Sequence, residues 1–478
     1  MKKNPIICVN NISISTMFDF YEKYGKLEKK LGEGSHGTVY RSSKGYALKV
    51  YDTKFIDCYI IREMSILSSM DHPNIIHMLD YADIKGYFQF AMPLGEYDLD
   101  TKMDEGPMEI RELKSITFQL FGALDYLHQR DIWHRDVKLD NILMMSDGTI
   151  KLCDFGLAKE GISQDMPYTD EVTTISYRPP EIELLINDIP TSYNEKIDIW
   201  SAGQCILNLF KGKYTSINKK DKIRLKNDLE AQDPLFSDFI FKVMAYDKDK
   251  RYSAREALEH PWLKKFTFSP IVDSKTHHFP LKDWVSFQKI SNFSVRMLYD
   301  WLYMVKKVFN LKDITLCLAI YILNRFLSFK QIESKNIILC SVGCFIIASQ
   351  VIEIYPPLLY KWSQLTSYTI ESIEKMNHII LITLNFDLEM PKFGSTDLLS
   401  IFLYFLTFYV SELCFEYSHF QLLKACQTAS LMVQKQEYDM NSEVQNIVKT
   451  LRYHASLFDD VLSKSEYKDE LGEWFEIE

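Results

Sequence analysis

The octet His134-Arg-Asp-Val-Lys-Leu-Asp-Asn141 most constrains how this chain can fold and what it can do. Within eight residues it places a carboxylate at Asp136, an ammonium at Lys138 and an amide at Asn141. Phosphoryl transfer to a hydroxyl uses these groups: the carboxylate accepts the proton, the ammonium steadies the phosphate and the amide oxygen helps to hold metal. We therefore predict that the octet forms the catalytic loop of a phosphoryl-transfer site.

Two motifs nearer the N-terminus would bind the nucleotide. The string Gly32-Glu-Gly-Ser-His-Gly-Thr-Val39 has the spacing G-x-G-x-x-G-x-V, in which absent side chains let backbone amides approach phosphates. Lys49 ends a strand-like run and could hold the α- and β-phosphates, and Glu63 is the only glutamate between Lys49 and His72. The alternatives are an ordinary turn and a surface salt bridge.

The segment after the octet supplies a second metal ligand and structural supports. Asp154-Phe-Gly156 follows a strand-like run, and we expect Asp154 to share Mg²⁺ ions with Asn141. Farther along the chain, Pro179-Pro-Glu181 closes the segment that follows Asp154-Phe-Gly156. We expect Glu181 to pair with Arg251 and Asp198 to brace the catalytic loop.

In this order the motifs resemble the eukaryotic protein kinase family over residues 24–266. The resemblance implies an α+β bilobal fold, ATP and Mg²⁺ as cofactors, and protein substrates. Lysine two places after Asp136 points to serine/threonine rather than tyrosine substrates; an inactive pseudokinase is the alternative. The ATP-binding positions that the resemblance implies are Leu31, Gly32, Glu33, Gly34, Ser35, His36, Gly37, Thr38, Val39, Ala47, Lys49, Glu63 and Met92.

The second half of the chain reads as helical, and Asp313 is well placed to cap a helix that runs through Leu327. This half also contains four strings that resemble a cyclin box. They are Arg296–Trp301, Asn324–Leu327, Ala348–Pro357 and Asn385–Pro391. The resemblance implies an all-α cyclin fold of two helical repeats, the second degenerate; a generic helical bundle is the alternative. The expected division is an N-terminal extension at 1–23, a kinase domain at 24–266, a linker at 267–290, a cyclin box at 291–390, and a second repeat with an acidic tail at 391–478.

The stretch Tyr168–Arg178 is similar to the activation segment of cyclin-dependent kinases. The similarity implies that Thr169 is the activating phosphosite, because a phosphate orders a loop by pairing with clustered basic groups. The groups expected around it are Arg62, Arg135 and Lys159. The residues expected to shape a pocket for proline after the target hydroxyl are Val172, Thr173 and Arg178, so that Ser/Thr-Pro sites are the predicted substrates.

Joining a kinase to a cyclin makes their association intramolecular, with an effective concentration that can reach the millimolar range. We expect the cyclin-like half to pack on the helix Tyr59–Met70 and to activate the kinase in cis. Gln350 and Asn377 stand where cyclins usually carry the lysine and glutamate that meet the kinase. The alternative is a constitutive kinase whose cyclin-like half docks substrates or transcription partners.

Charge and apolar patterning argue against nucleic-acid-binding, membrane and secreted proteins. Lys+Arg 55 against Asp+Glu 65 gives a net charge of −10, which argues against direct nucleic-acid or anionic-membrane binding. The longest apolar stretch, Leu398–Val410, is shorter than the ~18 residues that spanning a bilayer requires, and Met1–Ile14 lacks a signal-peptide core. Scattered cysteines without a C-x-x-C pair fit a reducing compartment, so we expect an intracellular protein of the cytoplasm or nucleus.

Overall fold

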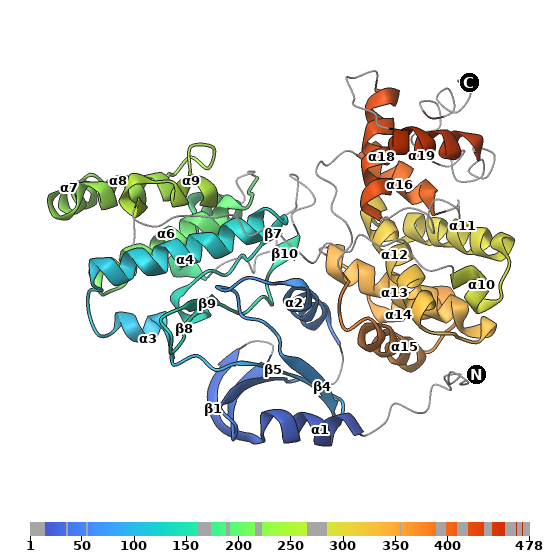
Figure 1. Ribbon diagram of the computed structural model, residues 1–478, viewed down its shortest axis with the longest axis horizontal. Helices are drawn as coiled ribbons and strands as arrows, with labels where there is room; N and C mark the ends of the chain where they lie inside the picture. The colour runs from blue at the N-terminus through green and yellow to red at the C-terminus, as the bar shows by residue number, and fades with distance from the viewer. Residues whose placement is uncertain are drawn as a thin grey trace. The chain divides into compact units, whose positions relative to one another are not determined.

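The chain forms two compact units, whose largest parts are residues 14–55 with 62–274 and residues 275–478 (Figure 1). The computed structural model describes residues 15–34, 37–53, 56–160, 174–187, 192–215, 222–264, 284–353, 355–388, 398–408, 419–434, 442–454, 465 and 471. The two units are described separately below, beginning with the one that contains the octet.

The first unit begins with a five-stranded antiparallel sheet in the order β1-β2-β3-β5-β4. The strands are β1 (Leu27–Gly34), β2 (Gly37–Ser42), β3 (Tyr46–Tyr51), β4 (Asp80–Ile84) and β5 (Tyr87–Pro93). Alternation along β3 sends Lys49 and Tyr51 to the face that meets helix α2 (Cys58–Ser69), while Leu48 points to the opposite face. The sheet and α2 thereby carry the predicted nucleotide-binding residues.

An N-terminal helix, α1 (Ser15–Tyr24), covers that opposite face of the sheet. Phe20 and Tyr24 pack with Leu48, and the cluster includes Ala82 on β4 and Ala91 on β5. The Tyr24 hydroxyl also donates a hydrogen bond to the Leu79 carbonyl, 3.3 Å away. The sequence predicted only an N-terminal extension here, whereas the structure makes α1 part of the sheet's core.

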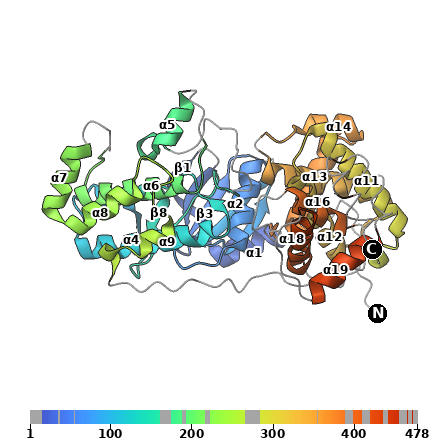
Figure 2. The ribbon, with the colours of Figure 1, turned by 90° about the horizontal axis from the view of Figure 1, so that it is seen from above.

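The rest of this unit is mainly helical and is built around α4 (Ile110–His128) and α6 (Lys196–Lys211). Ile116, Leu120, Leu124 and Leu127, whose spacing predicted a helix, are all buried in α4. Figure 2 shows α7 and α8 at the end of the unit away from the sheet. The other elements are α3 (Leu99–Met103), α5 (Pro180–Ile186), α7 (Lys222–Gln232), α8 (Pro234–Val243), α9 (Ala254–Leu258), β6 (Tyr97–Asp98), β7 (Ile132–Trp133), β8 (Ile142–Met144), β9 (Ile150–Leu152), β10 (Lys159–Glu160), and the 3-10 helices η1 (Leu139–Asn141), η2 (Ile175–Tyr177) and η3 (Pro261–Leu263).

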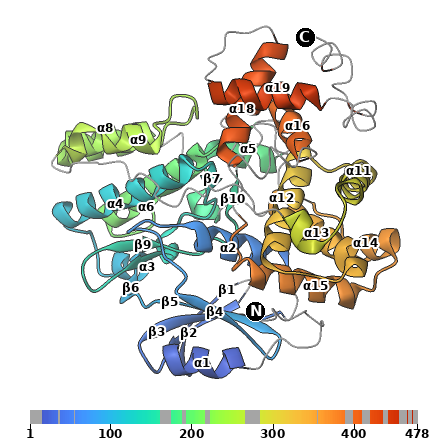
Figure 3. The same ribbon diagram turned by 45° about the vertical axis from the view of Figure 1, so that its right-hand side comes forward.

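All regular elements among the described residues of the second unit are helices. Helices α12 and α13 form its centre, with α14 and α15 toward one end and α16, α18 and α19 at the other (Figure 3). The elements are α10 (Trp284–Gln288), α11 (Asn292–Phe309), α12 (Asp313–Phe329), η4 (Ser334–Asn336), α13 (Ile337–Ile352), α14 (Leu359–Thr366), α15 (Ile370–Thr383), α16 (Leu398–Thr407), α18 (His419–Val433) and α19 (Ser442–Tyr453).

Two expectations for this unit need revision. Asp313 was expected to cap its helix, but Lys312 is the N-cap residue and Asp313 is the first helical residue, where it pairs with Lys306 at 2.5 Å. A carboxylate in the first turn still interacts favourably with the helix dipole. Among the described residues one helical stretch, Ser334–Ile352, has the length and the mean hydropathy, 1.7, to cross a membrane, but 67% of it is buried, as in the core helix of a packed domain.

Candidate active site

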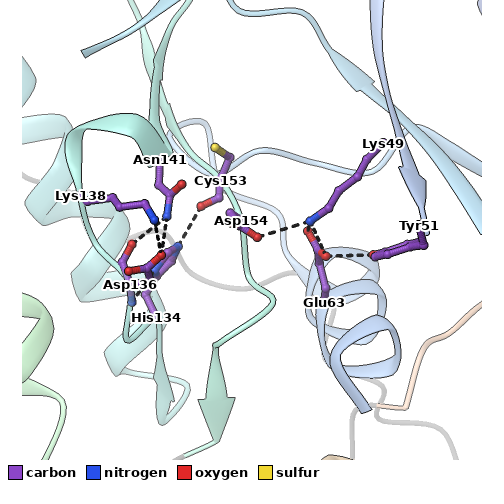
Figure 4. A network of polar contacts seen from close by, with 9 residues as sticks. All are labelled: Lys49, Tyr51, Glu63, His134, Asp136, Lys138, Asn141, Cys153 and Asp154. Atoms are coloured by element: carbon purple, nitrogen blue, oxygen red, sulfur yellow. Dashed lines mark hydrogen bonds and ion pairs between the residues drawn. The ribbon is translucent and has the colours of Figure 1, made fainter. Parts of the chain in front are cut away.

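A buried ion pair joins the sheet to helix α2. The Lys49 ammonium lies 2.6 and 2.7 Å from the two carboxylate oxygens of Glu63, and both side chains are almost fully buried (Figure 4). The same ammonium lies 3.3 Å from the Asp154 carboxylate. The structure thus brings together three residues that span 105 positions of the sequence, in the arrangement that the motifs predicted.

The charges of this cluster depend on one another. Burial alone would lower the pKa of Lys49, but the carboxylates of Glu63 and Asp154 raise it above its usual value. Partial burial would raise the pKa of Asp154, yet the Lys49 ammonium brings it below its usual value. Lys49 therefore carries its charge at neutral pH, and Asp154, whose side chain is 46% exposed, offers an ionised carboxylate toward solvent.

The catalytic loop places the predicted base and its neighbours in contact. The Asp136 carboxylate lies 2.8 Å from the Lys138 ammonium. The Asn141 side-chain amide donates to the Asp136 carbonyl at 2.9 Å and to its carboxylate at 3.1 Å. Because the amide nitrogen is used in this way, the Asn141 side-chain oxygen is the atom left for a metal ion.

Thr174 is a site residue that the sequence analysis did not identify. Its hydroxyl donates a hydrogen bond to the other Asp136 carboxylate oxygen at 2.9 Å, and the Lys138 ammonium lies 3.4 Å from it. Thr174 directly follows the predicted proline pocket residue Thr173, and its hydroxyl was the only signal that could have drawn attention to it. The carboxylate of Asp136 is therefore held on both oxygens.

The residues expected to brace the site also make the contacts that were predicted for them. Asp198 accepts hydrogen bonds from the backbone amides of His134 and Arg135, both at 2.8 Å. Arg251 makes two parallel bonds to Glu181 at 2.6 and 2.8 Å. These contacts brace the start of the catalytic loop and the start of α5.

Two site residues have backbone angles that non-glycine residues seldom adopt. Arg135 has φ of 66° and Asp154 has φ of 63°, both in the left-handed region. Such strain persists only where surrounding contacts fix it, and here Asp198 holds Arg135 while Lys49 contacts Asp154. One of these residues directly precedes the predicted base Asp136, and the other contacts the nucleotide-binding lysine.

The predicted nucleotide positions lie on β1, β2, β3 and β5. Ala47 faces Met92 across the β3–β5 pairing, while Leu31 is 46% exposed. Among the glycines, Gly37 is required by packing, because an added Cβ would lie 2.5 Å from the Val50 carbonyl oxygen, whereas Gly32 has open space. The other positions on these strands are Glu33, Gly34, Thr38 and Val39; Ser35 and His36 lie outside the described residues.

The predicted regulatory residues are described only in part. Arg62 lies on α2, and Arg135 donates from its Nε to the Leu157 carbonyl at 2.9 Å. The backbone of Lys159 pairs with Trp133, and Arg178 follows η2. Thr169, Val172 and Thr173 lie outside the described residues.

The two residues expected to meet the kinase lie on neighbouring helices of the second unit. Gln350 is half-buried near the end of α13, and Asn377 is buried on α15. The Asn377 side-chain oxygen lies where a Cβ on Gly343 would approach to 2.9 Å, so a glycine on α13 makes room for this amide.

The oxygen donors at the centre fit Mg²⁺ and a nucleotide. Mg²⁺ prefers carboxylate and amide oxygens and is usually held by one or two side chains together with substrate phosphates. Asp154 and Asn141 offer such a pair, on either side of which lie the ammonium groups of Lys49 and Lys138. The site can therefore hold a negatively charged phosphate beside a carboxylate that accepts a proton.

Comparison with known proteins supports the kinase-like reading of the first half of the chain and the cyclin-like reading of the second half. The model of the protein kinase domain matches residues 25–263, half of the chain, and the model of the cyclin N-terminal domain matches residues 268–389. Cyclin-dependent kinase 12 of Drosophila melanogaster is 29% identical over 328 residues, covering 55% of this chain and 28% of that protein. Cyclin-dependent kinase 14 of Xenopus tropicalis is 32% identical over 256 residues, covering 52% of this chain and 57% of that protein.

The match extends over most of one smaller relative. The cyclin-dependent kinase 4 homolog of Caenorhabditis elegans is 31% identical over 315 residues, covering 53% of this chain and 76% of that protein. The predicted α+β kinase fold followed by an all-α cyclin fold is confirmed. The chain belongs to the protein kinase family and carries a cyclin N-terminal domain after its kinase domain.

Proposed function

We propose that this chain is an ATP-dependent protein serine/threonine kinase of the cyclin-dependent type that works inside the cell, where ATP is available. The observation that carries the proposal is the Lys49 ammonium, which contacts both Glu63 and Asp154. In this proposal the kinase domain spans 24–266, the linker 267–290, the cyclin box 291–390 and the second repeat 391–478, after an extension at 1–23.

The residues of the site would divide the reaction among them. Asp136 accepts the proton of the substrate hydroxyl, and Thr174 and Asn141 fix the orientation of its carboxylate. Lys49 holds the α- and β-phosphates and Lys138 holds the phosphate in transfer. Mg²⁺, held by Asn141 and Asp154, would neutralise the charge that develops on the phosphate oxygens.

Transfer of labelled γ-phosphate from ATP to protein or peptide tests this proposal. The full chain is expected to label serine and threonine, and Asp136→Ala is expected to lower kcat about 10²–10⁴-fold, the usual contribution of a general base. Label on tyrosine alone, or an unchanged rate in Asp136→Ala, would refute the proposal.

We further propose activation in cis: the cyclin-like half stabilises the orientation of α2 in which Glu63 contacts Lys49. Support comes from the cyclin N-terminal domain in the same chain and from the burial of the Lys49–Glu63 pair, which must be aligned before the nucleotide can bind productively. Residues 1–270 alone are then expected to be slow, and residues 271–478 added in trans are expected to restore the rate. A fragment as fast as the full chain would favour the alternative, in which the cyclin-like half only docks substrates.

Substrate preference follows from the similarity of the activation segment. We propose that Val172, Thr173 and Arg178 select proline after the target hydroxyl and that phosphorylated Thr169 is held by Arg62, Arg135 and Lys159. A peptide library should show enrichment of proline directly after the phosphorylated residue, and the absence of enrichment would refute the preference.

A further inference from the structure

Tyr51 reaches the same carboxylate as the nucleotide-binding lysine. It ends β3 two residues after Lys49, so strand alternation places both side chains on one face of the sheet. Its side chain is fully buried, and its hydroxyl donates a hydrogen bond to Glu63 Oε2 at 2.9 Å (Figure 4). Glu63 thus has two neighbouring donors from one strand.

The second donor matters because Glu63 is buried. A buried carboxylate is costly unless hydrogen bonds compensate for the water that it loses. Lys49 is shared among several anions: it already lies 3.3 Å from Asp154, and phosphates of a bound nucleotide would compete for it too. The Tyr51 hydroxyl carries no charge, so phosphates attract it less strongly than they attract the Lys49 ammonium, and its bond to Glu63 is less exposed to this competition.

We propose that the Tyr51 hydroxyl is a positioning group that fixes Glu63, and through Glu63 both Lys49 and helix α2, while nucleotide enters and leaves. Its kinetic consequence rests on the proposed kinase activity. The ring of Tyr51 has a different role, since it packs against Phe90 with centroids 6.1 Å apart and lies 5.5 Å from the Lys49 ammonium.

Tyr51→Phe separates the two roles, because it keeps the ring and removes the hydroxyl. In the full chain we expect kcat/KM for ATP to fall about tenfold, as for loss of a hydrogen bond to a charged group, while KM for the peptide stays unchanged. Tyr24→Phe is the matched control: it removes a tyrosine hydroxyl of the same lobe that bonds the Leu79 carbonyl, away from the ion pair. The control is expected to retain wild-type kinetics.

A double-mutant cycle identifies the partner. If Tyr51 acts through the Glu63 carboxylate, Tyr51→Phe should have little further effect in a Glu63→Ala background, which offers the hydroxyl no acceptor at this position. Effects that multiply in the double variant would overturn the inference, and so would kinetics of Tyr51→Phe within twofold of wild type.

Hydrogen exchange without nucleotide tests the anchor independently of activity. Amides of residues 62–69 on α2 should exchange several-fold faster in Tyr51→Phe than in wild type or Tyr24→Phe, because Glu63 loses a fixed partner. Equal exchange of these α2 amides in the three proteins would refute the positioning role of the Tyr51 hydroxyl, even if the enzyme is active. Faster exchange in a chain without phosphotransfer would support the anchor while refuting the proposed function.

Discussion

The buried pair of Arg251 and Glu181 allows a quantitative test of what holds the helical lobe of the kinase domain together. The Arg251 side chain is fully buried and the Glu181 side chain is 6% exposed. Besides its two bonds to Glu181, Arg251 donates to the carbonyls of Lys196 at 2.9 Å and Ala245 at 3.0 Å. Its guanidinium carbon lies 5.1 Å from the centre of a Trp200 ring.

Arg251→Met keeps most of the side-chain volume but leaves the Glu181 carboxylate buried without its partner. Breaking a buried pair in this way costs about 3–5 kcal/mol, out of the roughly 5–15 kcal/mol that stabilise a domain. For a unit of this size the midpoint of thermal unfolding should fall by about 6–20 °C. Hydrogen exchange at α6, which lies within this unit, measures the loss without mixing in the second unit.

Two variants control for unrelated effects. Arg251→Met combined with Glu181→Met should recover most of the loss, because it replaces both charges by apolar groups. Arg255→Met removes the arginine of another bidentate pair, to Asp125, but Arg255 is 39% exposed and the Gln129 side-chain amide still donates to Asp125, so about 1 kcal/mol or less is expected. If Arg251→Met costs no more than Arg255→Met, burial does not set the strength of these pairs and the reasoning is wrong.

Three further perturbations test other parts of the structure. Thr174→Val should lower kcat about tenfold in steady-state assays, because one Asp136 oxygen loses its hydrogen bond, whereas Thr174→Ser should stay near wild type. Equal rates in the two variants would show that the Thr174 hydroxyl has no role in the reaction. Phe20→Ala should cost about 3–5 kcal/mol of unfolding free energy, because α1 is part of the sheet's core, and a cost below 1 kcal/mol would show that α1 is dispensable. Burial lowers the pKa of His72 to about 4. Between pH 6.5 and 4 the imidazole is therefore protonated in the unfolded chain but neutral in the folded chain, and the free energy of unfolding should fall by up to about 3 kcal/mol as the pH falls. Urea unfolding of wild type and His72→Gln across this range would contradict the assignment if both lose stability equally.

Residues predicted from the sequence lie in contact in the structure where chemistry fixes both residue type and spacing. Lys49, Asp136, Asn141 and Asp154 were identified because phosphate, metal and proton each require a particular functional group. Their contacts in the structure follow from the strand and loop positions that the motifs implied. Glu63 was found by elimination along one short helical stretch.

What sequence reasoning missed depends on side-chain direction. Tyr51 reads as a core aromatic of a strand, and only the folded geometry shows its hydroxyl at Glu63. Thr174 lies within the recognised segment Tyr168–Arg178, but the residue type alone does not show that its hydroxyl points at Asp136. Asp313 carries a capping type of side chain, yet the helix begins one residue earlier, a boundary error that periodicity cannot remove.

Cleavage between the two halves tests the central claim, activation in cis, most directly. A protease site placed within residues 271–280 would let the full chain be purified intact, cleaved, and separated by gel filtration, with the uncleaved chain as control. Because tethering supplies an effective concentration near the millimolar range, the uncleaved chain should keep its specific activity on dilution to nanomolar. We predict that the separated kinase half loses at least tenfold in activity and recovers it when the cyclin-like half is added back; a separated kinase half with full activity would contradict the claim.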